Sequence, residues 1–344
     1  MPLFNSQDIL VVGAGVLGLC TAAELARRGH AVTVVDPGGL NASTVAAGMI
    51  APAMEAAIDD LSPDHAALLR RARDAWSEFA AATGVRLDRH PAEWRGGNVE
   101  VLAGRLAALG FEHAYDREAG RLTTNEDWKV EPAQALAAMS RDVRVLEGRA
   151  TGLSLSNEGW RVVTTAGTVE VDQVVLATGA AEAMAGLPEE AARLLALIAP
   201  IRGQIGLVSE RLVEHVVRGP GAYVAPMGAG CVIGATMEAG ERSLTPDPER
   251  CAQMLDAAWA VLGQAPRPLT IEWRAGVRGA TPDGLPMAGL GAGLGAGTVG
   301  QGLHLALGPR RNGWLLGPLV ASVVADEVEG RSSKEPTLAP RRFI

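Results

Sequence analysis

Three glycines near the N-terminus have a spacing that suits binding of the phosphates of a nucleotide. Gly13, Gly15 and Gly18 form a G-x-G-x-x-G pattern. In such a turn the first glycine permits the sharp bend, the second lets the backbone approach a pyrophosphate, and the third lets helix and strand pack closely. Asp36 follows at roughly the 20-residue distance at which a carboxylate accepts hydrogen bonds from a ribose. This pattern therefore indicates dinucleotide binding.

The elements around these glycines are those that must position them. Residues 9–12 form a short apolar run rich in β-branched types, which predicts a strand buried on both faces. An amphipathic helix pattern follows, and Gly29 is placed to end it. Residues 31–35 predict a second buried strand, which Asp36 closes. A lone G-x-G-x-x-G is a weak signal, but this strand–helix–strand setting favours a nucleotide site over an ordinary glycine turn.

The composition is that of an ordinary enzyme and argues against several other function classes. The chain has 344 residues, enough for two domains, and a net charge of -8, which favours neither nucleic acid nor an anionic membrane as partner. Its three cysteines lack zinc spacing, so we expect no metal site and a reducing, cytoplasmic compartment. The first residues lack a basic region, so no signal peptide is expected. The apolar run 314–325 contains Pro318 and is shorter than the roughly 20 residues a bilayer requires, so it predicts a core helix.

The rest of the chain predicts further helices and two groups of strands. Ser62 and Pro63 are typical of a helix start, and that helix extends to about Thr83. Strands are expected at 143–146, 151–156, 160–165, 168–171 and 173–176, and the last leads directly into Ala177-Thr178-Gly179. From about residue 200, short alternating segments predict an antiparallel sheet, with strands at 205–208, 223–225, 231–236 and 269–273 and a helix over 248–262.

These elements predict an α/β fold with a Rossmann-like dinucleotide-binding domain and a second domain built on an antiparallel sheet. Residues 1–84, 130–199 and 279–344 are assigned to the first domain, and residues 85–129 and 200–278 to the second. Residues 85–129 suggest no chemical role. The spacing G-x-G-x-x-G recurs at Gly295, Gly297 and Gly300, but no buried strand precedes it, so we predict a loop there.

Several motifs together resemble the D-amino-acid-oxidase superfamily of FAD enzymes. They are G-A-G-V-L-G, S-T-V-A-A-G-M-I, A-T-G, P-I-R-G-Q, G-A-T-M, R-A-G-V-R-G-A-T-P-D-G-L-P and R-N-G-W-L-L-G-P. The resemblance covers nearly the whole chain and is weakest from 85 to 129. Within the superfamily the chain is most similar to the glycine oxidases of thiamine biosynthesis. The resemblance implies an FAD-binding domain and a substrate domain with the superfamily's fold.

The resemblance also implies which residues lie along the cofactor. None of the three cysteines lies where superfamily members attach flavin covalently, so noncovalent FAD is expected. The implied cofactor residues are Gly13, Ala14, Gly15, Val16, Gly18, Asp36, Thr44, Ala46, Ala47, Gly48, Met49, Thr178, Gly179, Arg278, Arg311, Asn312, Gly313, Trp314 and Leu315.

Four residues match catalytic positions of the superfamily. Arg278 matches the arginine that binds the substrate carboxylate, and Tyr223 matches the tyrosine that bonds to it. Met237 matches the residue that narrows the pocket, and Arg311 matches the R-N-G arginine at the site's edge. A planar guanidinium suits bidentate binding of a carboxylate. A surface arginine, a core tyrosine and a core methionine are the alternatives from the residue types alone.

The implied activity is oxidation of glycine, or a similarly small amino acid, to the imine and 2-oxo acid, with O2 reduced to H2O2. The enzyme would serve thiazole formation for thiamine, pass its imine to a thiazole synthase, and form a homo-oligomer. A D-amino-acid or sarcosine oxidase, a dehydrogenase of the same fold, and a flavin-binding subunit without turnover are the alternatives.

Overall fold

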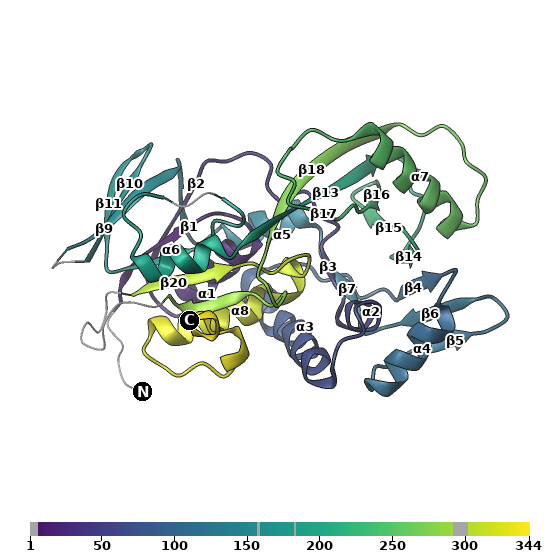
Figure 1. The fold of residues 1–344 in the computed structure, drawn as a ribbon, viewed down its shortest axis with the longest axis horizontal. Coiled ribbons are helices and arrows are strands. Elements are labelled where there is room, and N and C mark those ends of the chain that lie inside the picture. Colours follow the sequence, from purple (N-terminus) through teal and green to yellow (C-terminus); the bar gives the residue numbers. More distant parts are fainter. Residues whose placement is uncertain (1–5, 157–158, 182–183, 292–301) are drawn as a thin grey trace.

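Two sheets organise the chain in a computed structural model that describes residues 6–156, 159–181, 184–291 and 302–344 (Figure 1). A mainly parallel sheet contains the N-terminal strand, and a larger sheet lies beside it toward the other end of the molecule. Gly295, Gly297 and Gly300, where a loop was predicted, lie outside the described residues. The predicted mixed α/β architecture with a parallel and an antiparallel sheet is confirmed.

The first sheet has the strand arrangement of a nucleotide-binding domain. Its strands, in spatial order, are β19 (Met287–Leu290), β20 (Leu303–Leu307), β12 (Gln173–Leu176), β1 (Asp8–Val12), β2 (Ala31–Asp36) and β8 (Arg144–Glu147). All neighbours pair in parallel except β19, which is antiparallel to β20. Strand β1 is central and its apolar side chains are buried on both faces, as its unbroken apolar run predicted.

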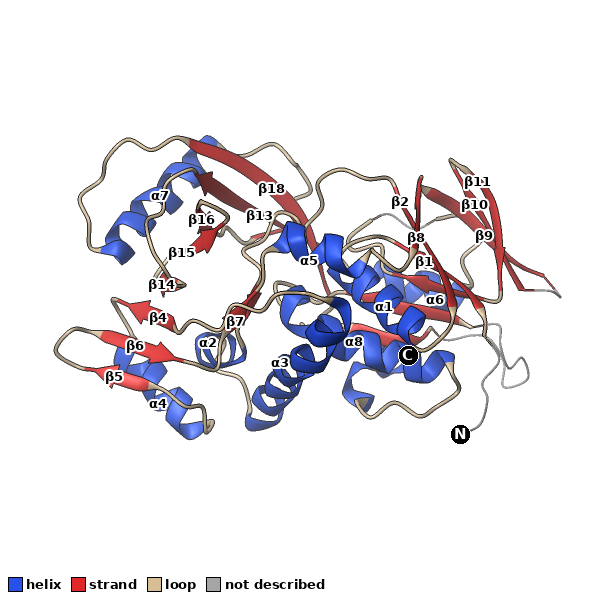
Figure 2. Cartoon of the chain, turned by 180° about the vertical axis from the view of Figure 1, so that it is seen from behind, coloured by secondary structure: helices blue, strands red, loops and turns tan. Residues whose placement is uncertain are grey.

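The two faces of this sheet are covered differently. Ile9 and Val11 of β1 face a core with helices, whereas Leu10 and Val12 face a three-stranded meander. The helices are α1 (Val16–Arg27), α3 (Pro63–Thr83), α5 (Pro132–Met139) and α8 (Gly313–Val328), and Figure 2 shows them in front of the sheet. The meander is β9 (Ala150–Ser156), β10 (Gly159–Thr164) and β11 (Gly167–Val171), and α6 (Glu189–Ala196) packs with it. The strands predicted between 143 and 176 are thus confirmed.

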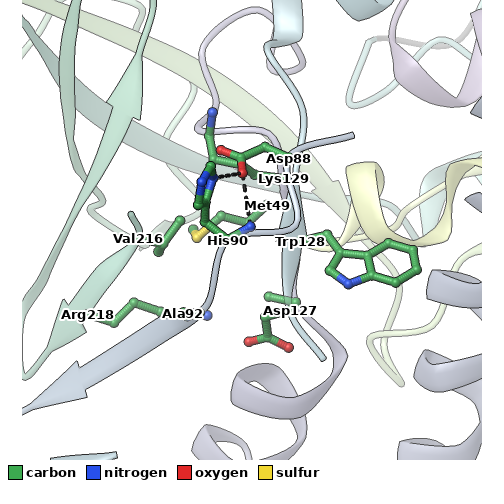
Figure 3. A pocket seen from close by; sticks show the side chains of 10 residues that line it. Met49, Asp88, His90, Ala92, Asp127, Trp128, Lys129, Val216 and Arg218 are labelled. Atoms are coloured by element: carbon green, nitrogen blue, oxygen red, sulfur yellow. Dashed lines mark hydrogen bonds and ion pairs between the residues drawn. The ribbon is translucent and has the colours of Figure 1, made fainter. Parts of the chain in front are cut away.

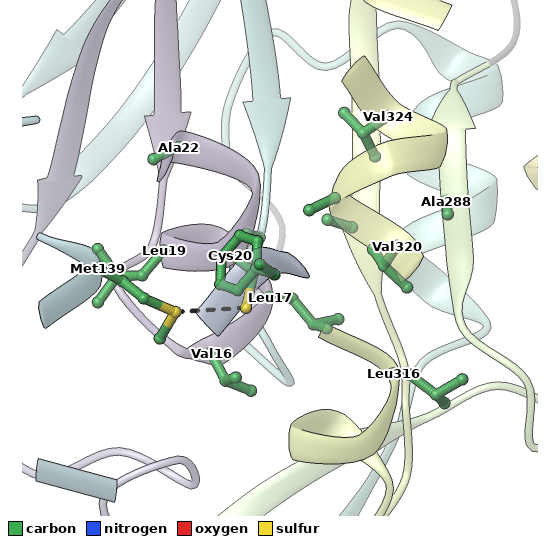
Figure 4. Packing of buried hydrophobic residues seen from close by; sticks show 14 of the residues in the cluster. Val16, Leu17, Leu19, Cys20, Ala22, Met139, Ala288, Leu316, Val320 and Val324 are labelled. Atoms are coloured by element: carbon green, nitrogen blue, oxygen red, sulfur yellow. Dashed lines mark hydrogen bonds between the residues drawn. The ribbon is translucent and has the colours of Figure 1, made fainter. Parts of the chain in front are cut away.

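Helices α1 and α8 pack closely on each other beneath the sheet (Figure 4). Gly317 of α8 faces Cys20 of α1, where an added Cβ would lie only 2.7 Å from the sulfur. The thiol of Cys20 in turn lies 3.4 Å from the sulfur of Met139 on α5. The apolar run 314–325, which predicted a core helix, forms most of α8, and Pro318 lies in the second turn of this helix.

The second sheet combines two separate parts of the chain. Its strands, in order, are β17 (Glu238–Ala239), β13 (Ala199–Val208), β16 (Gly230–Gly234), β15 (Ala222–Met227), β14 (Val217–Gly219), β4 (Ala92–Arg95), β6 (Arg121–Thr124) and β5 (Ala114–Asp116), with β18 (Ile271–Ala280) paired to β13. Helices α7 (Pro248–Leu262) and α4 (Val99–Ala108) pack against it. The strand predicted over 269–273 is instead Ile271–Ala280, because its ten residue pairs with β13 reach as far as Ala280.

Short elements connect the two sheets. They are β3 (Met49–Ile50), which pairs with β7 (Trp128–Lys129), and helix α2 (Pro52–Ile58). Helix α2 was not predicted from the sequence. Among the described residues, every helix is too short or too polar to cross a membrane.

Leu316→Ala tests the packing of α8 in the core beneath the first sheet. Leu316 is 1% exposed in the core beneath the first sheet, so truncation should lower the free energy of unfolding by about 2–5 kcal/mol. Leu40→Ala is the control, because Leu40 is 58% exposed and its loss should change stability by less than about 0.5 kcal/mol. Thermal unfolding of both variants measures the difference, and equal effects would contradict this view of the core.

Candidate active site

The turn between β1 and α1 has the geometry predicted for phosphate binding. Gly13 has a φ of 112°, and an added Cβ would lie 2.4 Å from the carbonyl oxygen of Ala177, so only glycine fits. At Gly18 a Cβ would lie 1.9 Å from the carbonyl oxygen of Gly13. Gly15 caps α1 without a side-chain bond, and the first turn of α1 has no acidic residue. The N-terminus of α1 is therefore suited to bind an anion.

Two side chains hold this turn. Asp36 Oδ2 accepts a hydrogen bond from the N–H of Ala14 at 2.7 Å, and Ser43 Oγ accepts one from the N–H of Val16 at 2.9 Å. Asp36 Oδ1 also accepts from the N–H of Gly38. Asp36 thus has a structural role that the spacing did not indicate, while its bond to a ribose stays a prediction.

A cavity of about 100 Å³ lies beside the turn. The start of α1, the segment around Ser43, strand β18 and the start of α8 all contribute to its lining. The predicted cofactor residues that line it are Gly15, Val16, Ala46, Gly179, Arg278, Arg311, Gly313 and Trp314.

A larger cavity of about 350 Å³ adjoins the first, since Ala46, Arg278, Arg311 and Trp314 line both. All four predicted catalytic residues, Arg278, Tyr223, Met237 and Arg311, line this larger cavity. Ala47, Gly48, Met49 and Asn312 of the predicted cofactor set also line it. The structure therefore brings the two predicted groups together at one place.

Some predicted cofactor residues line neither cavity. These are Gly13, Ala14, Gly18, Asp36, Thr44, Thr178 and Leu315. The Thr44 hydroxyl donates to the carbonyl oxygen of Asn41 at 2.9 Å, so it stabilises its own loop. Leu315 is 1% exposed in the apolar core. Contact of these residues with a cofactor stays a prediction.

Arg278 is a cavity arginine without an acidic partner. It lies within β18, and its Nη1 donates to the carbonyl oxygen of Thr236 at 3.2 Å and lies 3.3 Å from the sulfur of Met237. Among the described residues, no carboxylate is within ion-pair distance of it. Its removal from bulk water lowers the pKa of the guanidinium, yet an arginine stays charged. An unpaired charge in a recess is poised to bind an anion.

Two glycines make room for Arg278 and Tyr223. A Cβ at Gly203 of β13 would lie 2.1 Å from Arg278 Nη1, and a Cβ at Gly234 of β16 would lie 2.3 Å from the Tyr223 hydroxyl. Both glycines belong to motifs, P-I-R-G-Q and G-A-T-M, but the sequence did not indicate their steric role. Burial raises the pKa of Tyr223, and the positive charge of Arg278 opposes that rise, so the phenol keeps its proton.

Glu238 anchors the loop beside Arg278 to β13. Its carboxylate accepts hydrogen bonds from Arg202, from Gln204 at 2.6 Å and from the Thr236 hydroxyl at 2.7 Å. Partial burial opposes ionisation of Glu238, but these donors outweigh it and lower its pKa to about 2. Because the Thr236 carbonyl accepts from Arg278, this network orients the arginine indirectly.

Glu55 of α2 binds two further arginines. Its Oε1 accepts from Arg218 Nη2 at 2.7 Å, and its Oε2 accepts from Arg311 Nε. Glu55 is 5% exposed, and burial would raise its pKa, but the two guanidinium groups lower it. Arg311 Nη2 also lies 2.9 Å from Asp59 Oδ1, so it is held toward α2. No sequence pattern singled out Glu55 or Arg218, although an acid in the small apolar run P-A-M-E-A-A-I was a detectable signal.

Asp127 fixes the start of α2. It is 2% exposed and accepts hydrogen bonds from the N–H groups of Ala53 at 2.8 Å and Met54 at 3.1 Å. It lines a small cavity of about 10 Å³, together with Lys129 and Arg218 (Figure 3). Burial raises the pKa of Asp127 to about 7 against the opposing effect of Arg218 and these N–H groups. Residues 85–129, which suggested no chemical role, thus support the helix that carries Glu55.

The family model for FAD dependent oxidoreductases matches residues 8–327. The chain belongs to this family. The glycine oxidase of Pseudomonas aeruginosa is 28% identical over 98% of both chains. The bifunctional ThiO/ThiG protein of Nostoc is 29% identical over 97% of this chain and 54% of its own length, so the chain spans about half of that relative. The crystal structure of glycine oxidase from Geobacillus kaustophilus matches with a TM-score of 0.82 at 24% identity, covering 99% of this chain and 100% of that one.

The FAD of this family fits the residues around the two cavities. The α1 turn would hold the pyrophosphate, and residues 46–49 and the start of α8 would lie along the flavin. Gly48 has a φ of 72° and its Cβ would meet the carbonyl oxygen of Val130 at 2.2 Å, so this segment follows a fixed path. The Trp314 indole donates to the carbonyl oxygen of Ser43 at 3.2 Å, and Trp76 donates to the Trp314 carbonyl at 2.7 Å. The start of α8 is thus tied to both neighbouring elements.

Gly203→Ala should displace Arg278 while leaving the flavoprotein folded, because the new methyl group collides with the mobile end of an arginine rather than with backbone. We expect the affinity for acetate, measured by calorimetry on the FAD-loaded protein, to fall at least about tenfold. Gly104→Ala, in open space on α4, is the control and should bind acetate normally. Unchanged acetate binding by Gly203→Ala would contradict the role of Arg278.

Asp127→Asn should change the pH dependence of stability. The pKa of about 7 in the folded protein exceeds the ordinary value of 3.8, so this carboxyl stabilises the fold fully below about pH 4 and loses that contribution as the pH rises to about 7. Asparagine does not titrate, so from pH 4 to 8 the stability of the variant relative to wild type should rise by up to about 4 kcal/mol. Thermal unfolding across this range measures the trend, and a pH-independent difference would contradict it.

Proposed function

We propose that this FAD-dependent oxidoreductase oxidises glycine, or a similarly small amino acid, to the imine, which water hydrolyses to the 2-oxo acid. Dioxygen is the final oxidant and becomes H2O2. The observation that carries the proposal is Arg278, which lies where the two cavities meet and has no acidic partner in the part of the chain that the structure describes. The names of the relatives, glycine oxidase and ThiO/ThiG, support a small amino acid as substrate.

The chain's own residues bind and orient the substrate. Arg278 offers two parallel N–H donors to the carboxylate, and the protonated Tyr223 hydroxyl donates a further hydrogen bond. Met237 touches the Arg278 guanidinium and limits the space above it. Arg311 is held away by Glu55 and Asp59, so it shapes the edge of the site rather than competing for the carboxylate. Fixing the carboxylate orients the Cα–H bond, which is the main catalytic contribution of such a site.

No side-chain base is required, since the amine enters deprotonated. Among the described residues, Glu55 is the carboxylate that lines the larger cavity. Its two arginine partners keep it ionised, and its oxygens already accept hydrogen bonds from them, so it is not placed to act as a base. When bound, FAD supplies the two-electron acceptor for the Cα–H bond. The N-terminus of α8 opens onto the smaller cavity, where its dipole favours negative charge.

We propose that FAD is held noncovalently, since Cys20, Cys231 and Cys251 are buried and line neither cavity. Transfer of the imine to a thiazole synthase is supported by the ThiO/ThiG relatives, in which two named parts share one chain. The assignment of residues 85–129 and 200–278 to a substrate domain agrees with their shared sheet. A D-amino-acid or sarcosine oxidase is the second candidate and is separated by a substrate panel.

The proposal is tested by adding glycine to the FAD-loaded protein without oxygen. Loss of the flavin absorbance near about 450 nm, recovered with H2O2 on admitting air, is expected. Bleaching by sarcosine or D-alanine but not by glycine would select the second candidate. A flavin band that no amino acid bleaches would refute the proposed function.

Arg278→Ala should reduce kcat/KM for the amino acid by about 10²–10³-fold or more, equivalent to roughly 3–5 kcal/mol of transition-state binding. The melting temperature should not fall, because removal of an unpaired charge leaves no buried carboxylate without a partner. Arg267→Ala, a surface arginine paired with Glu210, is the control for general effects of losing a charge. Near-normal kinetics for Arg278→Ala would overturn the assignment.

A further inference from the structure

Arg218 brings a third guanidinium to the larger cavity, and one of its donors has no partner. The residue is 8% exposed on β14, and its Nη2 donates to Glu55. Its Nη1 is buried and makes no hydrogen bond with any described residue. Leaving a buried donor unsatisfied is unfavourable, and more so when the group is charged. Arg218 lines the larger cavity as well as the small cavity that Asp127 borders, so an anion bound in the larger cavity could supply the missing acceptor.

The position of Arg218 relative to Tyr223 follows from the strand register. The two residues are direct partners across the antiparallel pair β14–β15, so their side chains share one face of the sheet. Cβ atoms of such partners lie about 4.5–5.5 Å apart. The strands follow one another across the sheet in the order β13, β16, β15 and β14, and β18 pairs with β13. Tyr223 on β15 therefore lies between Arg218 on β14 and the strand that carries Arg278. A small molecule held by Arg278 and Tyr223 can therefore extend toward Arg218.

The charges around the cavity leave room for two anions. Its charged lining residues among those described are Arg218, Arg278, Arg311 and Glu55, an excess of two positive charges. One carboxylate on Arg278 compensates one of them. Asp59 pairs with Arg310 at 3.0 Å as well as with Arg311, so Arg310 and Asp59 together leave the excess unchanged. Asp127 shares the small neighbouring cavity with Arg218, and its pKa of about 7 leaves it only partly ionised at neutral pH. The cavity also continues past Arg218 to Pro220 and Trp94, so there is space at this end.

We infer that the preferred substrate carries a second carboxylate, which binds Arg218 Nη1 while the first carboxylate binds Arg278. Arg218 is then the residue that selects an acidic amino acid over glycine. The inference rests on the proposed function, because that function assigns the first carboxylate to Arg278. Suitable substrates are a glycine whose nitrogen carries a second carboxymethyl group, and D-amino acids with a short acidic side chain.

The first test needs no variant. Calorimetric titration of the FAD-loaded wild-type protein compares malonate with acetate and succinate with propionate. Each dicarboxylate differs from its monocarboxylate counterpart by a second carboxylate in place of one hydrogen. We expect at least one dicarboxylate to bind at least about tenfold more tightly than its monocarboxylate counterpart. Equal affinities would mean that water alone satisfies Arg218 Nη1, and would overturn the inference.

The second test compares turnover of iminodiacetate and D-aspartate with turnover of glycine. In wild type the better diacid should exceed glycine in kcat/KM by at least about tenfold, and Arg218→Gln should reduce that ratio at least about tenfold. Arg267→Gln, far from the cavity, should leave the ratio unchanged. If Arg218→Gln does not fold because Glu55 loses a partner, Arg218→Lys keeps the ion pair but lacks the second donor, and it should lower the ratio too.

The outcomes separate the inference from the proposed function. Reduction of the flavin by glycine with no advantage for either diacid would overturn the inference alone. Failure of every amino acid to reduce the flavin would refute the proposed function, while the carboxylate titrations would still decide whether Arg218 binds a second anion.

Discussion

The rest of the site depends on one constraint, the guanidinium of Arg278, which faces a cavity and has no carboxylate beside it among residues 6–156, 159–181, 184–291 and 302–344. Removing a charge from water is unfavourable unless other groups compensate for it. For Arg278 the compensation is slight, a carbonyl oxygen of Thr236 and the sulfur of Met237. A bound anion would supply further compensation, and this is the physical basis of the proposed carboxylate site. Gly203 and the Glu238 network keep the guanidinium in the orientation that such an anion requires.

The neighbouring arginines show how the same side chain is given different roles. Arg311 and Arg218 both bind Glu55, which is itself placed by α2, whose N-terminus Asp127 caps. Arg311 is further held by Asp59. These ion pairs hold the guanidinium groups of Arg218 and Arg311 beside Glu55 at the wall of the cavity. Among the described residues Arg278 has no such carboxylate partner, and for this reason we assign the first carboxylate of the substrate to it.

The two cavities that Arg278 lines lie where the two sheets meet. Strand β18 pairs with β13 along its whole length and carries Arg278 to the border between the larger and the smaller cavity. The smaller cavity begins at the glycine turn of the first sheet, and α8 opens onto it from the other side. An enzyme whose cofactor supplies the chemistry needs mainly such positioning, with little acid or base chemistry from side chains.

The sequence by itself determined the local units and the family. The turn at Gly13, Gly15 and Gly18 was predictable because its strand, turn and helix signals lie in one contiguous stretch, and α8 was predictable from its apolar run. Motif resemblance also pointed to Arg278 and Tyr223, and the structure places them in one cavity.

Only the tertiary structure decided which arginines are paired and which are not. Glu55, Arg218 and Arg311 are far apart in the chain, and residues 85–129 gave no signal that Asp127 supports α2. The extension of β18 through Arg278 likewise depends on its pairing with β13. Ion pairing and burial depend on distances between segments that fold together from remote parts of the chain, and spacing along the sequence does not encode those distances.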